Sequence, residues 1–168
     1  MLALLQQPEL HDGDRLSRDG FMRRWEQIPE FKQAELIEGV VYLASSVSLA
    51  HGSYDAIFVQ WIGRHCFGVE QGLRVTTNTT LFLGDSTYQP DIALFRPTGN
   101  EGMGCEYLEQ LPVLVIEISN SSKSDDLGPK LAAYRSAGLR DYITVLLEEQ
   151  RVEWRVLSGS QYRLLQPQ

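Results

Sequence analysis

Apolar residues recur along the chain with the spacings of both helices and strands. The clearest helix is predicted over 50–67. Its side chains form one continuous stripe at helical spacing: Tyr54, Ile57, Phe58, Trp61, Ile62 and His65. The clearest strand is predicted over 113–119, whose sequence VLVIEIS is apolar almost throughout. This pattern is typical of a strand that is buried on both faces of a sheet.

Weaker patterns complete the order of elements. One short helix is predicted from Ser17, which can cap it, to about Ile28, and another over 126–137, closed by Gly138. Further strands are predicted over 36–44, 73–83, 91–96, 141–147, 151–157 and 161–165. The resulting order, α-β-α-β-β-β-α-β-β-β, predicts an α/β or α+β fold with a mixed sheet.

The length of 168 residues suits one domain. Residues 1–16 are polar and turn-rich, and we interpret them as a flexible N-terminal arm, with residues 17–168 as the single domain. No apolar run reaches the ~18 residues that a membrane span needs, and the first ten residues lack the features of a secretory signal. We therefore expect a cytoplasmic protein with no membrane partner.

The charge of the chain limits its partners. With 22 acidic and 15 basic residues the net charge is −7, whereas proteins that hold nucleic acid nonspecifically usually carry excess Lys and Arg. Residues 120–140 are locally basic, with four basic and two acidic side chains. A polyanion would therefore have to bind at a limited part of the surface, with the help of a divalent cation.

Two acids stand at the ends of apolar strands. Glu117 lies inside VLVIEIS, where an unpaired carboxylate would cost several kcal/mol, so it needs a metal, a cation or a shifted pKa. Strand alternation puts Ser119 on the same face as Glu117. Asp91 follows Pro90 and opens the apolar strand IALF. Two such carboxylates could share Mg²⁺ or a similar hard ion.

Lys130 is the third candidate. It lies about one turn into the helix that begins near Asp126, where a positive charge opposes the helix macrodipole. Its side chain is expected to point back over the loop that follows Glu117, and Asp126 stands four residues before it. A lysine in this position suggests a group that stabilises negative charge.

Four segments of the chain together resemble one known family. They are ELIEGVVY (35–42), His51 at the start of the long helix, QPDIALF (89–95) and VIEISNSSKSDDLGPKLAAYRSAG (115–138). From about residue 17 to 157 the chain is similar to the Uma-two type of the PD-(D/E)XK nuclease superfamily. The most specific part is Glu117 with the residues spaced after it: Ser122, Asp126, Lys130, Tyr134 and Gly138.

The resemblance implies a restriction-endonuclease-like core, in which helices flank a central mixed sheet. Asp91 matches the Asp of the PD element and Glu117 the acid of the (D/E)XK element, and the resemblance makes both of them ligands of Mg²⁺ or Mn²⁺. Glu38 or Glu35 could match an additional N-terminal acid of the superfamily.

One departure concerns the catalytic lysine. The superfamily pattern has Lys two residues after the acid, where this chain has Ser119. In this family the lysine is on the following helix, which makes Lys130 the replacement and Asp91, Glu117 and Lys130 the expected catalytic residues.

The same residues also have simpler interpretations. Asp91 alone would be a turn-capping acid, Glu117 alone a member of a buried ion pair, and Lys130 alone a solvated helix lysine. His51 could act as a general base or phosphate contact, or it could be a structural residue at the helix start.

These readings give three hypotheses of function. The first is a metal-dependent endonuclease that acts on DNA. The second is a nuclease fold with weak or lost catalysis that serves as a binding module, and the third is a structural Glu117–Lys130 ion pair without a metal. A homodimer through the terminal strands, which carry Tyr142, Trp154 and Tyr162, is a further expectation.

Overall fold

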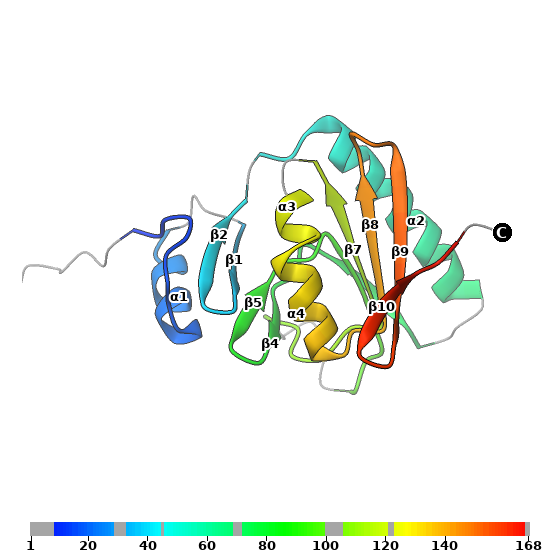
Figure 1. Ribbon diagram of the computed structural model, residues 1–168. Helices are drawn as coiled ribbons and strands as arrows, with labels where there is room; N and C mark the ends of the chain where they lie inside the picture. Colours follow the sequence, from blue (N-terminus) through cyan, green and yellow to red (C-terminus); the bar gives the residue numbers. More distant parts are fainter. Residues whose placement is uncertain are drawn as a thin grey trace, which may run out of the picture.

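Two separate sheets organise the protein in the computed structural model, which describes residues 9–28, 33–44, 46–68, 72–99, 106–120 and 123–166. The larger sheet has six strands in the order β10-β9-β8-β7-β6-β3 (Figure 1). Their bounds are β3 Arg74–Thr77, β6 Ile92–Phe95, β7 Leu114–Ser119, β8 Asp141–Leu146, β9 Arg151–Ser158 and β10 Gln161–Leu164. Only β7 and β8 are parallel among the described pairs, so the sheet is mixed, as predicted.

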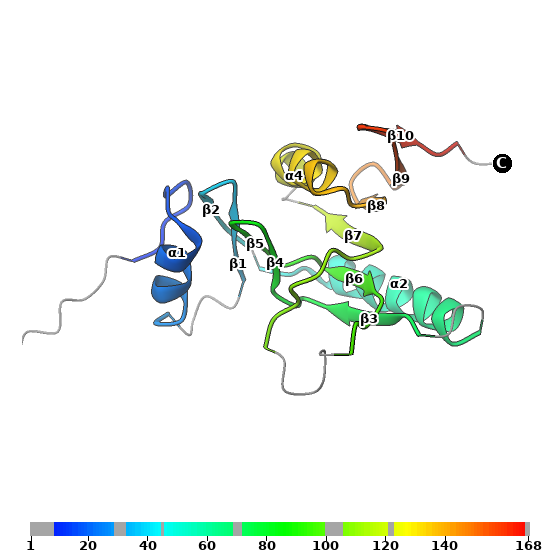
Figure 2. The same cartoon turned by 90° about the horizontal axis from the view of Figure 1, so that it is seen from below.

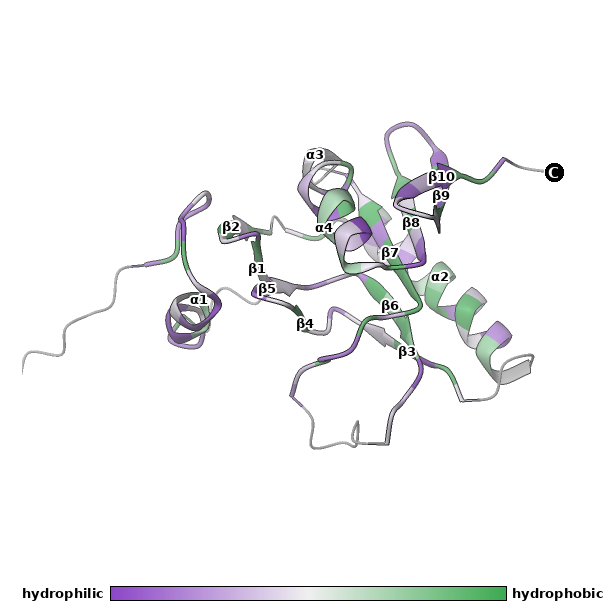
Figure 3. Ribbon diagram, turned by 60° about the horizontal axis from the view of Figure 1, so that its bottom comes forward, coloured by the Kyte–Doolittle hydropathy of each residue, from purple (hydrophilic) through white to green (hydrophobic). Residues whose placement is uncertain are grey.

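Helices cover both faces of this sheet (Figures 1 and 2). The parallel pair needs a crossover connection, which α3 Lys123–Asp126 and α4 Pro129–Ala137 provide on one face. The long helix α2, Leu49–Gly68, lies on the other face. The hydropathy colouring shows hydrophobic residues on β6, on β7 and along α2 (Figure 3). The α+β class and the flanked mixed sheet expected from the sequence are confirmed.

Alternation along β7 separates two cores. Val115 belongs to the cluster on the α4 side, together with Tyr134 and Tyr142. Ile116 and Ile118 belong to the cluster on the α2 side. Because side chains alternate along a strand, Glu117 and Ser119 share the α4 face with Val115. This is the arrangement that the sequence predicts.

The smaller sheet, in the order β2-β1-β5-β4, forms a second layer beside the first (Figure 2). Its strands are β1 Ala34–Ile37, β2 Val40–Leu43, β4 Leu81–Leu83 and β5 Ser86–Tyr88. Helix α1, Arg18–Trp25, begins at Ser17, whose hydroxyl accepts a hydrogen bond from the backbone N–H of Gly20, so the predicted cap is confirmed. Phe21 of this helix packs against β1 and β2.

Residues 10–16 differ from the flexible arm expected there. The backbone N–H of Gly13 donates to Val41, and Val41 donates in turn to the carbonyl of Asp14. Leu10 is only 2% exposed. The free edge of β2 supplies backbone partners for this segment, which explains why a polar, turn-rich sequence is held in place. Residues 1–8 of the expected arm lie outside the described residues.

The single strand predicted over 73–83 is two strands in different sheets. Asn78 has a positive φ of 48°, and its backbone N–H points to the carbonyls of Pro90 and Asp91. The left-handed conformation at Asn78 turns the chain out of β3 and toward β4. A run of β-branched residues does not reveal such a change of sheet.

The stripe predicted on α2 is only partly buried. Ile62 and Cys66 reach the core, whereas Ile57 is 58% and Trp61 47% exposed. Trp61 instead meets Trp154 of β9 edge to face. The helix therefore contacts the sheet along one side of the stripe and leaves the other side open. Within the described ranges, no helix combines the length and apolar character that crossing a membrane requires.

The helix predicted over 126–137 is broken at Gly128. A Cβ at Gly128 would lie 2.5 Å from the backbone carbonyl oxygen of Ser124, a separation that only glycine avoids. The break lets α4 restart at Pro129 and places Lys130 in its first turn. Gly138 ends α4 in the left-handed conformation, as predicted.

We expect Gly128→Ala to lower the free energy of unfolding by about 1–3 kcal/mol, because backbone atoms must move to accept the methyl group. Urea unfolding followed by circular dichroism measures the change. Gly63→Ala is the matched control, since nothing lies within 4 Å of its added Cβ inside α2 and alanine favours helix by ~0.5–1 kcal/mol. Equal stability of the two variants would contradict the steric account.

Candidate active site

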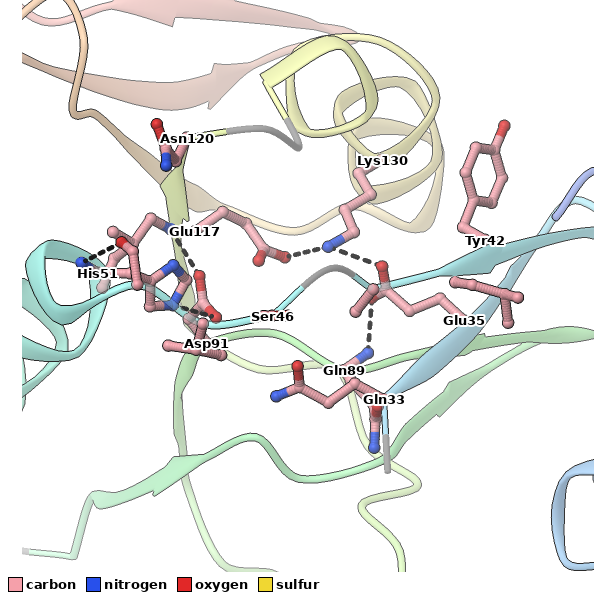
Figure 4. A pocket seen from close by; sticks show the side chains of 15 residues that line it. Gln33, Glu35, Tyr42, Ser46, His51, Gln89, Asp91, Glu117, Asn120 and Lys130 are labelled. Atoms are coloured by element: carbon pink, nitrogen blue, oxygen red, sulfur yellow. Dashed lines mark hydrogen bonds and ion pairs between the residues drawn. The ribbon is translucent and has the colours of Figure 1, made fainter. Parts of the chain in front are cut away.

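Sheet topology brings Asp91 and Glu117 to the same end of the larger sheet. Asp91 directly precedes β6, and Glu117 lies near the end of β7. The two strands are antiparallel, with Ile92 opposite Ile116, so the start of one lies beside the end of the other. Both acids line a cavity of about 150 Å³. Figure 4 shows Glu117 between the His51–Asp91 pair and Lys130.

Lys130 is the centre of a buried ion cluster. Its Nζ lies 2.8 Å from Oε2 of Glu35. The same atom is 3.3 Å from Oε1 of Glu117 and 3.3 Å from Oδ1 of Asp126. The lysine is 5% exposed, although a positive charge in the first turn of a helix opposes its macrodipole. Three carboxylates from three different elements offset this cost.

Two of these carboxylates are fixed by further hydrogen bonds. Oε1 of Glu35 accepts a 2.7 Å bond from the backbone N–H of Gln89. Oδ2 of Asp126 accepts a 2.7 Å bond from the Ser119 hydroxyl, and its backbone carbonyl accepts one from Tyr142. Ser119 and Asp126 therefore hold Lys130 in position, and neither side chain lines the cavity.

His51 and Asp91 form a second pair beside this cluster. Nε2 of His51 lies 3.0 Å from Oδ1 of Asp91. The other oxygen, Oδ2, accepts a 2.6 Å bond from the backbone N–H of Ile118. His51 enters the site because it lies in the first turn of α2, and this end of the helix lies beside Asp91.

Burial sets the protonation of the cluster. Desolvation raises the pKa of Glu117 well above its usual value of 4.5, although the Lys130 ammonium acts in the opposite direction. Desolvation also raises the pKa of Glu35. For Lys130 the desolvation is outweighed by Glu117, Glu35 and Asp126, so its pKa lies well above 10.5 and the side chain stays charged. The hydrogen bond to Asp91 raises the pKa of His51.

Sequence reasoning left Glu35 and Glu38 equivalent, and the structure separates them. Glu35 points from β1 into the cavity. Glu38 is exposed in the turn between β1 and β2, with a positive φ of 50°, and does not line this cavity. The structure thus brings Glu35, but not Glu38, to the other candidate residues.

Asp55 is a nearby acid that the sequence analysis missed. It lies one helical turn after His51 on α2, and its Oδ1 is buried without a hydrogen-bond partner among the described residues. Burial raises the pKa of Asp55, and the charge of Asp91 raises it further. The i, i+4 spacing from His51 is the signal in the sequence that could have found it.

The site carries an excess of negative charge. Among the described residues, four carboxylates lie close to two groups that can carry a positive charge, Lys130 and His51. The four are Glu35, Asp91, Glu117 and Asp126. Oε1 of Glu117 is buried and makes no hydrogen bond with a described residue, although Lys130 is near. An arrangement of this kind must either retain protons or attract a cation.

The donor set fits a hard divalent ion. Across the described ranges, no three Asp, Glu, His or Cys side chains are grouped so that they alone would surround a metal. Mg²⁺ needs only one or two carboxylates, because water and substrate phosphate fill its other positions. Asp91 and Glu117 both line the cavity and would be the two carboxylates of such a site.

Comparisons with known proteins agree with this fold. The family model described as "Uma2: Putative restriction endonuclease" matches residues 20–168. A crystal structure described as a putative nuclease belonging to DUF820, from Anabaena variabilis, is 18% identical, with 89% of this chain and 83% of that chain covered at a TM-score of 0.69. At this identity the likeness shows a common fold. A search of curated proteins found no match.

The raised pKa of Glu117 predicts a pH-dependent stability. The native state keeps this proton at pH values where the unfolded chain has released it, so the unfolding free energy falls as the pH rises above about 4.5. Glu117→Gln lacks this titration, so we expect its free energy of unfolding to fall less than that of the wild type as the pH rises above about 4.5. Urea unfolding at several pH values measures the difference.

Glu148→Gln removes an exposed acid and serves as the control, whose stability curve should run parallel to that of the wild type. A Glu117→Gln curve that is also parallel would mean that folding does not raise the pKa of Glu117.

Proposed function

Because the chain belongs to the Uma2 family of putative restriction endonucleases, we propose that it is a metal-dependent endonuclease that hydrolyses DNA phosphodiester bonds. The observation that carries the proposal is the excess of carboxylates around a buried lysine at an open cavity. A stabilising ion pair would need only one acid for each base, and it would gain nothing from an opening to solvent.

Asp91 and Glu117 are the proposed ligands of Mg²⁺ or Mn²⁺. When bound, the ion supplies a water of lowered pKa and neutralises charge on the scissile phosphate. Asp91 is prepared for this role, since the backbone N–H of Ile118 and the ring of His51 fix both of its oxygens. Glu117 contributes an oxygen that forms no hydrogen bond within the described structure.

Lys130 is the proposed charge-stabilising group. Glu35 and Asp126 hold its ammonium beside Glu117, so no side-chain motion is needed to bring a positive charge to the cavity. A fixed cation in a partly dry site stabilises the negative charge that develops during phosphoryl transfer. His51 and Lys130 lie on opposite sides of Glu117 (Figure 4). His51 orients Asp91 there and can contact a phosphate oxygen.

The alternative of a binding module with little catalysis rests on one observation. The Lys130 ammonium already has three carboxylate neighbours, which limits its contact with a substrate. The DNA substrate, the ion, the cytoplasmic location and the homodimer stay predictions. Of the aromatic residues expected at a dimer interface, Tyr142 is fully buried and Tyr162 stacks on it, so both serve the core of one chain.

We expect the purified protein to nick supercoiled plasmid in Mn²⁺, and Asp91→Asn and Lys130→Met to reduce the rate at least 100-fold. The first variant removes a ligand charge and the second the charge-stabilising group. Asp85→Asn changes an exposed turn acid and should cut at the wild-type rate. Wild-type cutting by Asp91→Asn would refute the site assignment.

Metal binding should also be visible without any reaction. We expect Mg²⁺ or Mn²⁺ at about 100-fold excess over Kd to raise the melting temperature of the wild type by ~5 °C or more. The rise should disappear in Asp91→Asn and in Glu117→Gln and persist in Asp85→Asn. Differential scanning fluorimetry measures it. Metal binding without nicking would favour the binding module, and no shift in the wild type would favour the structural ion pair.

A further inference from the structure

A second cavity lies at the opposite end of the larger sheet. The first residues of β7 and β8, Leu114 and Asp141, line it, whereas the candidate active site lies at the last residues of β7. The second half of α2 and the end of β6 form its other sides. Its volume of about 510 Å³ falls within the range of pockets that bind small molecules.

Two tryptophans form an aromatic wall of this cavity. Trp61 of α2 and Trp154 of β9 meet edge to face, with ring centroids 6.2 Å apart. Trp61 is 47% exposed, while the indole N–H of Trp154 donates a 2.8 Å hydrogen bond to Asp141. The bond fixes the ring of Trp154, so the wall exists before a ligand arrives. Large rigid rings of this kind provide contact area at a low cost in conformational entropy.

Aliphatic side chains line the inner part. Leu94 and Leu114 are 7% exposed and belong to the core on the α2 side. Leu111 and Val113, both 38% exposed, come from the segment before β7. An apolar cavity of this size gives water few polar partners, so an apolar ligand body would replace that water favourably.

Charges at the edge select the type of ligand. Arg96 is exposed at the end of β6, and Arg140, whose side chain is 79% exposed, stands just before β8. Asp141 also lines the cavity, but its carboxylate already accepts a hydrogen bond from Trp154 and lies 3.4 Å from Nε of Arg140. The edge is therefore cationic on a chain of net charge −7. Arginine guanidinium groups bind phosphate in bidentate fashion.

We propose that this cavity binds a nucleotide, with the base against Trp61 and Trp154 and the phosphate at Arg96 and Arg140. A flat aromatic body joined to a phosphate matches the aromatic wall, the aliphatic floor and the cationic edge together. The ligand is either a free nucleotide or the phosphorylated end of a DNA strand, which share this chemistry. The proposal does not depend on nuclease activity, because none of the candidate catalytic residues lines the cavity.

Tryptophan fluorescence in EDTA tests the proposal with deoxyadenosine 5′-monophosphate as the probe. We expect saturable quenching, with weaker binding of deoxyadenosine and of inorganic phosphate when each is added alone. Arg96→Gln and Trp61→Leu should each raise Kd about tenfold or more, which calorimetry can measure for both variants. Both positions are exposed, so the variants should fold.

Two controls separate this site from the candidate active site. Arg163→Gln changes an arginine that does not line the cavity, and Asp91→Asn removes a proposed metal ligand, so both should bind the nucleotide as the wild type does. No saturable binding, unchanged affinity in Arg96→Gln, or equal binding of phosphate alone would overturn the proposal. Competition by a short 5′-phosphorylated oligonucleotide that exceeds that of the mononucleotide would assign the site to a strand end.

Discussion

The buried ammonium of Lys130 is the interaction on which the site depends. It joins β1, β7 and the helical crossover through one carboxylate from each. Because β1 belongs to the smaller sheet and β7 to the larger one, the ammonium links the two sheets. A charge that is 5% exposed cannot be left without partners, so the three carboxylates must stay close together. Conversely, three acids this near to one another must either surround a cation or retain protons. The ammonium and the carboxylates of the cluster therefore stabilise one another.

Stability alone does not explain this cluster. Replacing buried ion pairs by apolar residues is often neutral or stabilising, because the attraction barely exceeds the desolvation cost. Here the cost is larger, since burial raises the pKa of both Glu35 and Glu117. A fold selected only for stability would have apolar side chains at these positions. The excess of negative charge would be neutralised by a cation bound from solution. In that case the carboxylates that cost stability are the ones that the proposed chemistry needs.

The sequence identified the residues that break a local rule. Glu117 was found because its neighbours in β7 are aliphatic, and Lys130 because its charge opposes a helix terminus. Glu35 could not be chosen over Glu38, since Leu36 and Ile37 between them are both buried and show no alternation. The hairpin turn decides this case, because it places Glu38 outside the strand. The sequence around Asp55 does not distinguish it from other acids in a helix. Its raised pKa comes from burial and from the charge of Asp91, which are properties of the tertiary structure.

The junction of the two sheets shows why the rest needed the structure. Asn78 leaves β3 in the left-handed conformation and bonds back to Pro90 and Asp91, and Gln89 then bridges the gap. The side chain of Gln89 accepts a hydrogen bond from the backbone N–H of Ala34, and the backbone N–H of Gln89 donates one to Glu35. These bonds join segments more than fifty residues apart, which no local pattern encodes. Asp91 therefore lies directly before β6, where the sheets meet, and the position of the site follows from this junction.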